Sequence, residues 1–488
     1  MERLKKLKEY LKNIENLNYT TSVLRWEMDT IAPKSSYNYL IDVSTKYELE
    51  SFKLSTSSDF IKLVEDVINS EEYEQLNEMQ KRYIQKLKSD YYQFSRIPED
   101  FYKEYCELVN NSLNAWVEAK NKSNYSIFKP YLIKVIESTK KYYSYMYPNA
   151  NNLYDCMLND YEEGITTSII DNLFNELKEK IVPIIKNLKS KELTSINTKL
   201  SDSQLFEISK FMLDYIGFDN SRGALGIYTH GYTMKLNNND VRISFSNKNV
   251  ITDILSTVIH EGGHGIFEQN IDESLANIPA YDINKCALHE SQSRFFENIL
   301  GRNVNFWVPI YKEVKEKLKI EMTIDEFIEQ FNNAKPSFIR TEADELTYCM
   351  HIIIRYEIEK DIFNDKIDLE ELPSIWNKKY KEYLGLDVTS DKDGILQDMH
   401  WSEGAFGYFP SYLVGSIFDG MLLETVNKNL GNVNDLLKNG NIKEITKFLN
   451  NNIHRYGGAY NINEIAKKVC GKDLEIEPLV KYFREKYE

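Results

Sequence analysis

Residues 251–264 read ITDILSTVIHEGGH, and this stretch joins a helical pattern to a candidate metal site. Its apolar residues recur three and four positions apart, which predicts the buried face of an α-helix. The stretch ends in His260-Glu261-Gly262-Gly263-His264, the pattern HExxH. Residues four positions apart lie about one helical turn from each other, so both imidazoles can bind one cation with Glu261 beside them. The stretch predicts a catalytic metal site on a helix, although the same pattern also occurs by chance on exposed helices.

A catalytic zinc site needs a third protein ligand and an open position for water. Glu290 is the candidate, because it lies in a segment with helical apolar spacing, LHESQSRFFENIL at 288–300. It follows His264 by 26 residues (290 − 264), which is enough for a loop and a returning helix. The alternative is that Glu290 pairs with a lysine or arginine on an exposed helix face. We predict that His260, His264 and Glu290 bind the metal and that Glu261 is the general base.

Helical spacing continues through most of the chain, with one interruption. Residues 1–215 carry apolar positions three and four apart, as in Leu4, Leu7 and Leu11, which is typical of helices packed on helices. Between Ala224 and Phe245 the apolar residues alternate with polar ones on either side of an Asn-rich turn, which predicts a small hairpin. The predicted fold class is therefore mainly α with a minor sheet.

Length, charge and cysteine content limit the class of protein. No Pro, Gly and Ser cluster marks a linker in the 488 residues, so we expect one domain at 1–488, with a helical lobe at 1–215 and a metal-site and substrate-binding region at 216–488. The net charge of −15 disfavours nucleic acid and anionic membranes as partners. No secretion signal or run of about 18 apolar residues is present, so a cytoplasmic location is expected. Five scattered cysteines without a CxxC pair disfavour a disulfide framework or a cysteine zinc site.

Several long blocks resemble one known family. The similarity runs in order through essentially the whole chain, from VLRWEMDTIAP at 23–33 to LVKYFREKYE at 479–488. The blocks resemble those of the carboxypeptidase Taq family of metallocarboxypeptidases, the M32 peptidases. They include HEGGHGIFEQN at 260–270, HESQSRFFENILGRN at 289–303, PSFIRTEADELTYCMHIIIRYEIE at 336–359, GILQDMHWSEGAFGYFPSYLVGS at 394–416 and NNIHRYGGAY at 451–460.

The resemblance implies a fold, an activity and a cofactor. It implies a single large gluzincin-like helical body with a long substrate cleft and a small sheet near the active site. It also implies that His260, His264 and Glu290 bind one divalent metal ion, most often zinc but with cobalt or manganese as alternatives. Glu261 would then act as general base and later as general acid. The expected activity is removal of C-terminal amino acids from peptides, one at a time and with broad specificity, by a homodimer.

Other residues are candidates for stabilising the oxyanion that forms during hydrolysis. His230, His400 and Tyr408 can donate hydrogen bonds to it in addition to the metal. The alternative for each histidine is a packing role. The chain has His230-Gly231-Tyr232 where the family usually has His-Pro-Phe, so side-chain preference is less transferable than the core chemistry.

A carboxypeptidase must also bind the terminal carboxylate of its substrate, and arginine suits that task. Arg340 and Arg242 lie in blocks that resemble the family's IRxxADE and DxRxT blocks, and we expect one of them to bind the substrate end. The alternative is an internal salt bridge, between Arg242 and Asp240 or between Arg340 and Glu342 or Asp344.

Asp344 and Glu345 have a further possible role. Metal-binding histidines usually donate their second ring N–H to a carboxylate, which fixes the tautomer. These two acids are candidates for that contact.

Two other functions compete with the carboxypeptidase hypothesis. One is an oligoendopeptidase of related helical fold, which would also cleave peptides whose C-terminus is blocked. The other is a peptide-binding protein without catalysis, against which the intact set of site residues argues.

Overall fold

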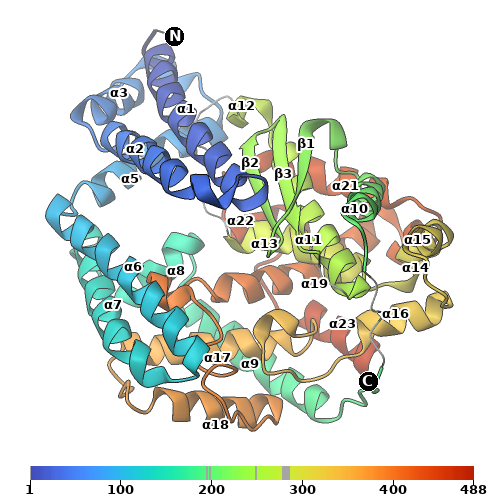
Figure 1. Ribbon diagram of the computed structural model, residues 1–488. Coiled ribbons are helices and arrows are strands. Elements are labelled where there is room, and N and C mark those ends of the chain that lie inside the picture. Colours follow the sequence, from blue (N-terminus) through green and yellow to red (C-terminus); the bar gives the residue numbers. More distant parts are fainter. Residues whose placement is uncertain (1, 194–195, 197–198, 248–249, 277–285) are drawn as a thin grey trace.

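The first helix follows the apolar stripe that the sequence predicts, because Leu4, Leu7, Leu11 and Ile14 are all buried along α1 (Figure 1). The computed structural model describes residues 2–193, 196, 199–247, 250–276 and 286–488. The helices before the sheet are α1 (Glu2–Thr30), α2 (Tyr37–Ser55), α3 (Ser58–Ile68), α4 (Glu71–Glu74), α5 (Glu78–Phe94), α6 (Glu99–Lys122), α7 (Tyr125–Met146), α8 (Leu153–Tyr161), α9 (Thr167–Lys186) and α10 (Asp202–Ile216).

One small sheet interrupts the helices, as predicted. Its strands are β1 (Gly223–Ile227), β2 (Tyr232–Asn237) and β3 (Asp240–Phe245), in the order β1-β3-β2. Strands β2 and β3 form the predicted antiparallel hairpin. The sheet also contains β1, which pairs parallel to β3. The alternating pattern of the hairpin did not predict this strand. The apolar residues of β3 are fully buried, so this strand anchors the sheet.

Most of the rest of the described chain is helical, which confirms the mainly α fold class. The helix α13 continues directly into a π-helix, η3 (Phe295–Leu300). The helices after the sheet are α11 (Ile251–Gln269), α12 (Glu273–Ala276), α13 (Cys286–Arg294), α14 (Val304–Trp307), α15 (Tyr311–Leu318), α16 (Ile324–Asn332), α17 (Tyr348–Phe363), α18 (Leu372–Leu384), α19 (Pro410–Leu430), α20 (Val433–Lys438), α21 (Ile442–Asn452), α22 (Ile462–Cys470) and α23 (Glu477–Tyr487).

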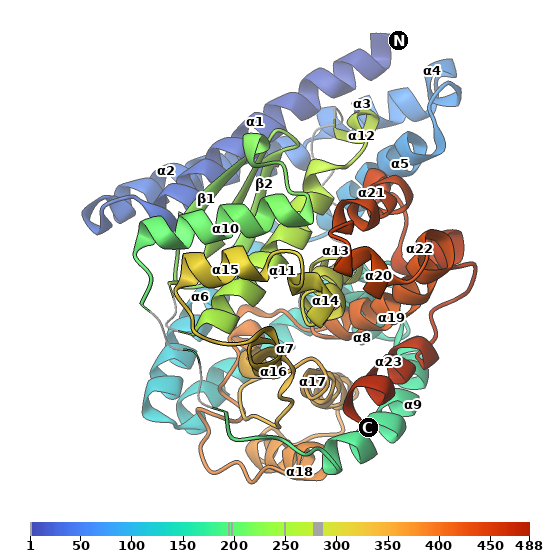
Figure 2. The ribbon, with the colours of Figure 1, turned by 90° about the vertical axis from the view of Figure 1, so that its right-hand side faces the viewer.

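The sheet lies between α1 on one side and α10 and α11 on the other (Figures 1 and 2). Behind it, α13 packs against both α11 and α19. The approach of α19 to α13 is close, because a Cβ on Gly415 would lie 2.7 Å from the carbonyl oxygen of Ala287. Two neighbouring helices therefore hold α13 from two sides.

The buried apolar side chains form one cluster that runs from Leu4 in α1 to Phe483 in α23. Among the described residues, none of the helices has the length and apolar composition that crossing a membrane requires. The organisation into one domain with a lobe boundary near residue 215 stays a prediction.

Candidate metal centre and active site

The three predicted ligands lie together. His260 and His264 come from α11 and Glu290 from α13, and one ligand atom of each lies within 4.8 Å of the others. Oε2 of Glu290 is 3.5 Å from Nε2 of His264 and 3.9 Å from Nε2 of His260. Bond lengths of ~2.0–2.2 Å at tetrahedral angles require separations of roughly 3.4 Å between ligand atoms. The donor set and its spacing therefore fit one divalent ion.

A glycine brings the two ligand-bearing helices into backbone contact. A Cβ on Gly263 would lie 2.7 Å from the carbonyl oxygen of Gln292 and 2.7 Å from the Cα of Ser293. A side chain at this position would push α11 away from α13. The absence of a side chain at Gly263 thus explains how Glu290 of α13 reaches the histidines of α11.

The second ring nitrogen of His260 has a carboxylate partner that the sequence analysis missed. Nδ1 of His260 donates to Oε2 of Glu297 at 2.8 Å. The assignment of this contact to Asp344 or Glu345 is wrong for His260, because both acids bind other groups. Asp344 accepts from the backbone N–H groups of residues 346 and 347, and Glu345 accepts from Tyr482, Lys486 and Tyr487. The spacing could have found Glu297, since seven residues after Glu290 is two helical turns on the same face.

An arginine holds the other oxygen of the third ligand. Nε of Arg294 donates to Oε1 of Glu290 at 2.6 Å, and its guanidinium lies 4.0 Å from the ring centre of Tyr348. Burial opposes ionisation of Glu290, but the charges of Arg294 and His260 and the contact with His264 together outweigh it and hold the carboxyl pKa well below its usual range. Glu290 therefore pairs with an arginine, but this pair is buried and not on the exposed helix face that the alternative assumed, and Oε2 still faces the histidines.

The environments of the two histidines push their pKa values in opposite directions. Burial lowers the pKa of His264 to about 3, so this imidazole is neutral and ready to bind a metal. Burial acts the same way on His260, but the carboxylates of Glu290 and Glu297 outweigh it and raise the pKa of His260 to about 9. A metal ion replaces a proton at such a site.

Glu261 is buried on α11 beside these ligands, and a residue of the neighbouring strand orients it. Oγ1 of Thr233 in β2 donates to Oε2 of Glu261 at 2.8 Å. Burial raises the pKa of the Glu261 carboxyl, a shift that suits a group that both accepts and releases a proton.

The candidates for oxyanion stabilisation fall into two places. His400 stacks on Tyr408 with ring centres 5.4 Å apart, and burial lowers the pKa of His400 to about 4. The Tyr408 hydroxyl accepts from Tyr412 at 3.1 Å, and burial raises the pKa of Tyr408 to about 12, with a further contribution from the charge of Glu290. His230 is exposed between β1 and β2, next to Gly231, where a Cβ would lie 3.4 Å from Oε1 of Glu261.

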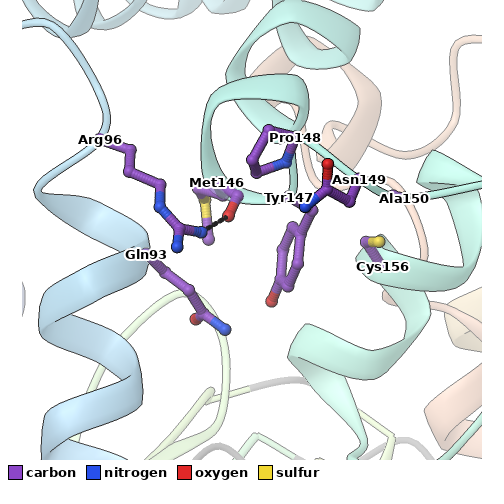
Figure 3. A pocket seen from close by; sticks show the side chains of 8 residues that line it. All are labelled: Gln93, Arg96, Met146, Tyr147, Pro148, Asn149, Ala150 and Cys156. Atoms are coloured by element: carbon purple, nitrogen blue, oxygen red, sulfur yellow. Dashed lines mark hydrogen bonds between the residues drawn. The ribbon is translucent and has the colours of Figure 1, made fainter.

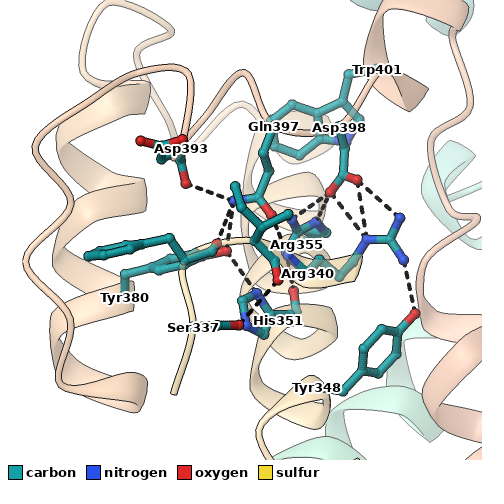
Figure 4. A network of polar contacts seen from close by, with 12 residues as sticks. Ser337, Arg340, Tyr348, His351, Arg355, Tyr380, Asp393, Gln397, Asp398 and Trp401 are labelled. Carbon is teal, nitrogen blue, oxygen red and sulfur yellow. Dashed lines mark hydrogen bonds and ion pairs between the residues drawn. The ribbon is translucent and has the colours of Figure 1, made fainter. Parts of the chain in front are cut away.

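Arg340 lies in a buried polar network (Figure 4). Its Nη2 donates to Oδ1 of Asp398 at 3.0 Å, and its Nη1 donates to the Tyr348 hydroxyl at 3.0 Å. Arg355 binds the other oxygen of Asp398, with Nε at 2.7 Å from Oδ2. The charges of the two arginines outweigh burial and hold the pKa of Asp398 well below its usual range. The partner of Arg340 is thus Asp398, 58 residues away, and neither of the two local acids expected as the alternative.

Arg242 makes the local ion pair that was expected as its alternative role. Its Nε and Nη2 donate to the two oxygens of Asp240 at 3.0 and 2.9 Å. The guanidinium also lies 5.7 Å from the ring centre of Trp26 in α1.

A separate pocket of about 350 Å³ lies where α5 ends near the connection from α7 to α8 (Figure 3). Arg96 lines it and donates to the carbonyl oxygen of Met146 at 2.8 Å. None of the predicted site residues lines this pocket, so it has no part in the proposed chemistry.

Comparisons with known proteins identify the family of this chain. The family model described as carboxypeptidase Taq (M32) metallopeptidase matches residues 6–487. Carboxypeptidase 1 of Bacillus subtilis is 38% identical, with 98% of this chain and 97% of that protein covered. The solved structure of a Pyrococcus furiosus carboxypeptidase is 30% identical with a TM-score of 0.94, and that of an M32 carboxypeptidase from Deinococcus radiodurans is 26% identical with a TM-score of 0.94. Each alignment covers 100% of this chain and 99% of the solved chain. The chain therefore belongs to the carboxypeptidase Taq (M32) family of metallopeptidases, and it is a metallocarboxypeptidase.

Proposed function

We propose that this enzyme hydrolyses the last peptide bond of peptides with a free C-terminus, with Glu261 as the general base and general acid. The observation that carries the proposal is the position of Glu261, which is buried on the same helix as two metal-ligand candidates and directly follows one of them. A divalent ion held by His260, His264 and Glu290 would lower the pKa of a water molecule and polarise the scissile carbonyl.

The protein's own groups then move one proton. Glu261 accepts a proton from the attacking water while the water oxygen bonds to the carbonyl carbon. Glu261 then gives this proton to the leaving amine as the C–N bond breaks. Thr233 holds the carboxylate of Glu261 in place through its hydroxyl. Tyr408, His400 and His230 are the candidates that donate to the oxyanion, and no covalent enzyme intermediate is required.

Arg340 is the better candidate for the terminal carboxylate. Asp398 and Tyr348 use three of its five N–H groups in the described structure. Two donors are therefore left for a substrate, and the network holds the guanidinium rigidly. Arg242, by contrast, uses its Nε and Nη2 fork on Asp240, which supports a structural role.

The proposal also covers the metal ion, the specificity, the oligomeric state and the location. Two histidines and one carboxylate suit zinc, but they also accept cobalt or manganese. The family resemblance supports a broad side-chain preference, a long substrate cleft and a homodimer, and the negative charge supports a cytoplasmic location.

One experiment tests the proposal against its rivals. The purified protein is incubated with a free-ended peptide and with the same peptide amidated at its C-terminus, each with and without a chelator, and products are identified by mass spectrometry. We expect stepwise loss of C-terminal residues from the free peptide alone, abolished by the chelator and by Glu261→Gln. Internal cleavage of both peptides would indicate an oligoendopeptidase. No cleavage by a metal-loaded sample would indicate a binding protein.

A further inference from the structure

The two metal-ligand histidines are supported in different ways. His260 donates through Nδ1 to Glu297, the usual device for fixing a ligand imidazole. Nδ1 of His264 is also buried, yet it has no hydrogen-bond partner among the residues that the structure describes. A different contact must therefore hold this ring with Nε2 toward Glu290.

The face of His264 is covered by another imidazole. The rings of His264 and His289 stack with centroids 4.2 Å apart and planes at 18°. His289 precedes the ligand Glu290 in α13, so the stack joins the two ligand-bearing helices directly. A ring in face-to-face contact cannot rotate about its Cβ–Cγ bond without colliding with its neighbour.

His289 is itself fixed by a buried ion pair. Its Nε2 donates to Oε1 of Glu268 at 3.0 Å, and Nζ of Lys235 in β2 lies 2.9 Å from Oε2 of Glu268. The side chains of Lys235 and Glu268 are 18% and 11% exposed. Phe267 closes the edge of the ring, with centroids 5.2 Å apart at 82°. Groups from α11 and β2 thus restrain the His289 ring through the stack with His264, the contact with Phe267 and the hydrogen bond at its ring nitrogen.

We infer that His289 is a positioning residue that holds the imidazole of His264 by stacking, and that Glu268 and Lys235 lock His289 for this purpose. The inference rests on the proposed metal site at His260, His264 and Glu290. A stacked ring would then hold His264, whereas a hydrogen-bonded carboxylate holds His260.

The test separates the stack from the ion pair below it. Co²⁺ is the probe, because its visible absorption spectrum reports ligand geometry, and its dissociation constant is measured by competition with a chromophoric chelator. His289→Ala removes the ring, so it should weaken Co²⁺ binding about tenfold and alter the spectrum. A tenfold loss lies within the range of affinity losses known for residues that support metal ligands. His289→Phe keeps a ring face and should retain tighter binding and a spectrum nearer the wild type than His289→Ala does.

A matched pair of lysine variants distinguishes positioning from general stability. Lys235→Met removes the support of Glu268 and should weaken Co²⁺ binding severalfold. Lys178→Met removes a similarly buried pair with Glu357, whose side chains are 21% and 14% exposed, between α9 and α17. We expect this control to lower the melting temperature of the metal-free protein but to leave the Co²⁺ dissociation constant unchanged.

Three outcomes decide between the explanations. Co²⁺ binding by His289→Ala within twofold of the wild type, with the same spectrum, would overturn the inference. Equal losses in His289→Ala and His289→Phe would overturn the role of stacking. If His264→Ala binds Co²⁺ as tightly as the wild type, the proposed metal site itself is wrong, whatever the His289 variants do.

Discussion

Gly263→Ala tests whether backbone contact between α11 and α13 sets the position of Glu290. The new Cβ would lie 2.7 Å from two backbone atoms, whereas ordinary contacts begin near 3.4 Å. The helices would have to separate by about 0.7 Å, the difference between these distances, because backbone atoms cannot rotate away. Metal ligands must hold their distances within about 0.2 Å. We therefore expect the zinc dissociation constant to rise at least tenfold.

The neighbouring glycine provides a matched control. A Cβ on Gly262 would lie 2.5 Å from Cδ1 of Ile216 and 2.7 Å from Cδ2 of Leu213, so it is equally crowded, but only by the ends of side chains. Overpacking costs about 1–3 kcal/mol and is partly offset by a gain of about 1 kcal/mol in helix propensity.

Calorimetric titration of the metal-free variants with Zn²⁺ measures the zinc dissociation constant, and urea unfolding measures the free energy of unfolding. Gly262→Ala should lose stability but bind zinc within threefold of the wild type. If Gly263→Ala binds zinc as tightly as Gly262→Ala, the reasoning from backbone contact is refuted.

Three further changes have defined outcomes. Glu297→Gln removes the carboxylate that accepts from His260 and should weaken zinc binding about 10–100-fold, measured by chelator competition; unchanged affinity would mean that this contact is dispensable. Arg340→Ala should raise KM for free-ended peptides sharply, whereas Arg242→Ala should chiefly lower the melting temperature, and the reverse result would exchange their roles. Burial lowers the pKa of His454 to about 3, so below pH 6.5 the unfolded chain binds a proton that the folded one does not. Stability should therefore fall by up to about 1.4 kcal/mol per pH unit between pH 6.5 and 3 because of this residue. His454→Gln should flatten the pH dependence of urea unfolding in that window, and an unaltered slope would contradict the assignment.

The sequence predicted features whose cause is local. Histidines one helical turn apart, the alternation around Asn237–Asp240 and the apolar stripe of α1 all depend on spacing within a single element. The helical spacing of 288–300 also predicted Glu290 as the third ligand, and the structure brings this residue within 3.9 Å of both histidines. The contact of Gly263 with α13 shows why this position of the motif has no side chain.

Contacts between segments that are distant in the sequence were harder to predict. The partner of Arg340 comes from 58 residues away, and two acids nearer in sequence appeared equally suitable. Pro410 begins α19, and the buried Phe409 before it has a helical backbone (φ −56°, ψ −38°), although a residue before proline usually adopts an extended one. Tertiary packing decides such cases, and no local pattern encodes it.

The stack of His289 on His264 is another contact that depends on tertiary packing and not on a local pattern. Nothing in HExxH or in the spacing of 288–300 specifies which imidazole faces which. That arrangement arises when β2 supplies Lys235 to Glu268 and the two helices meet.

One divalent ion should bind between α11 and α13, close to Glu261. Anomalous diffraction at the zinc absorption edge, from crystals of zinc-loaded Glu261→Gln, would locate it. We expect one strong peak per chain, about 2 Å from Nε2 of His260, Nε2 of His264 and a carboxylate oxygen of Glu290. A peak bound by other residues, or one that lacks Glu290, would contradict it.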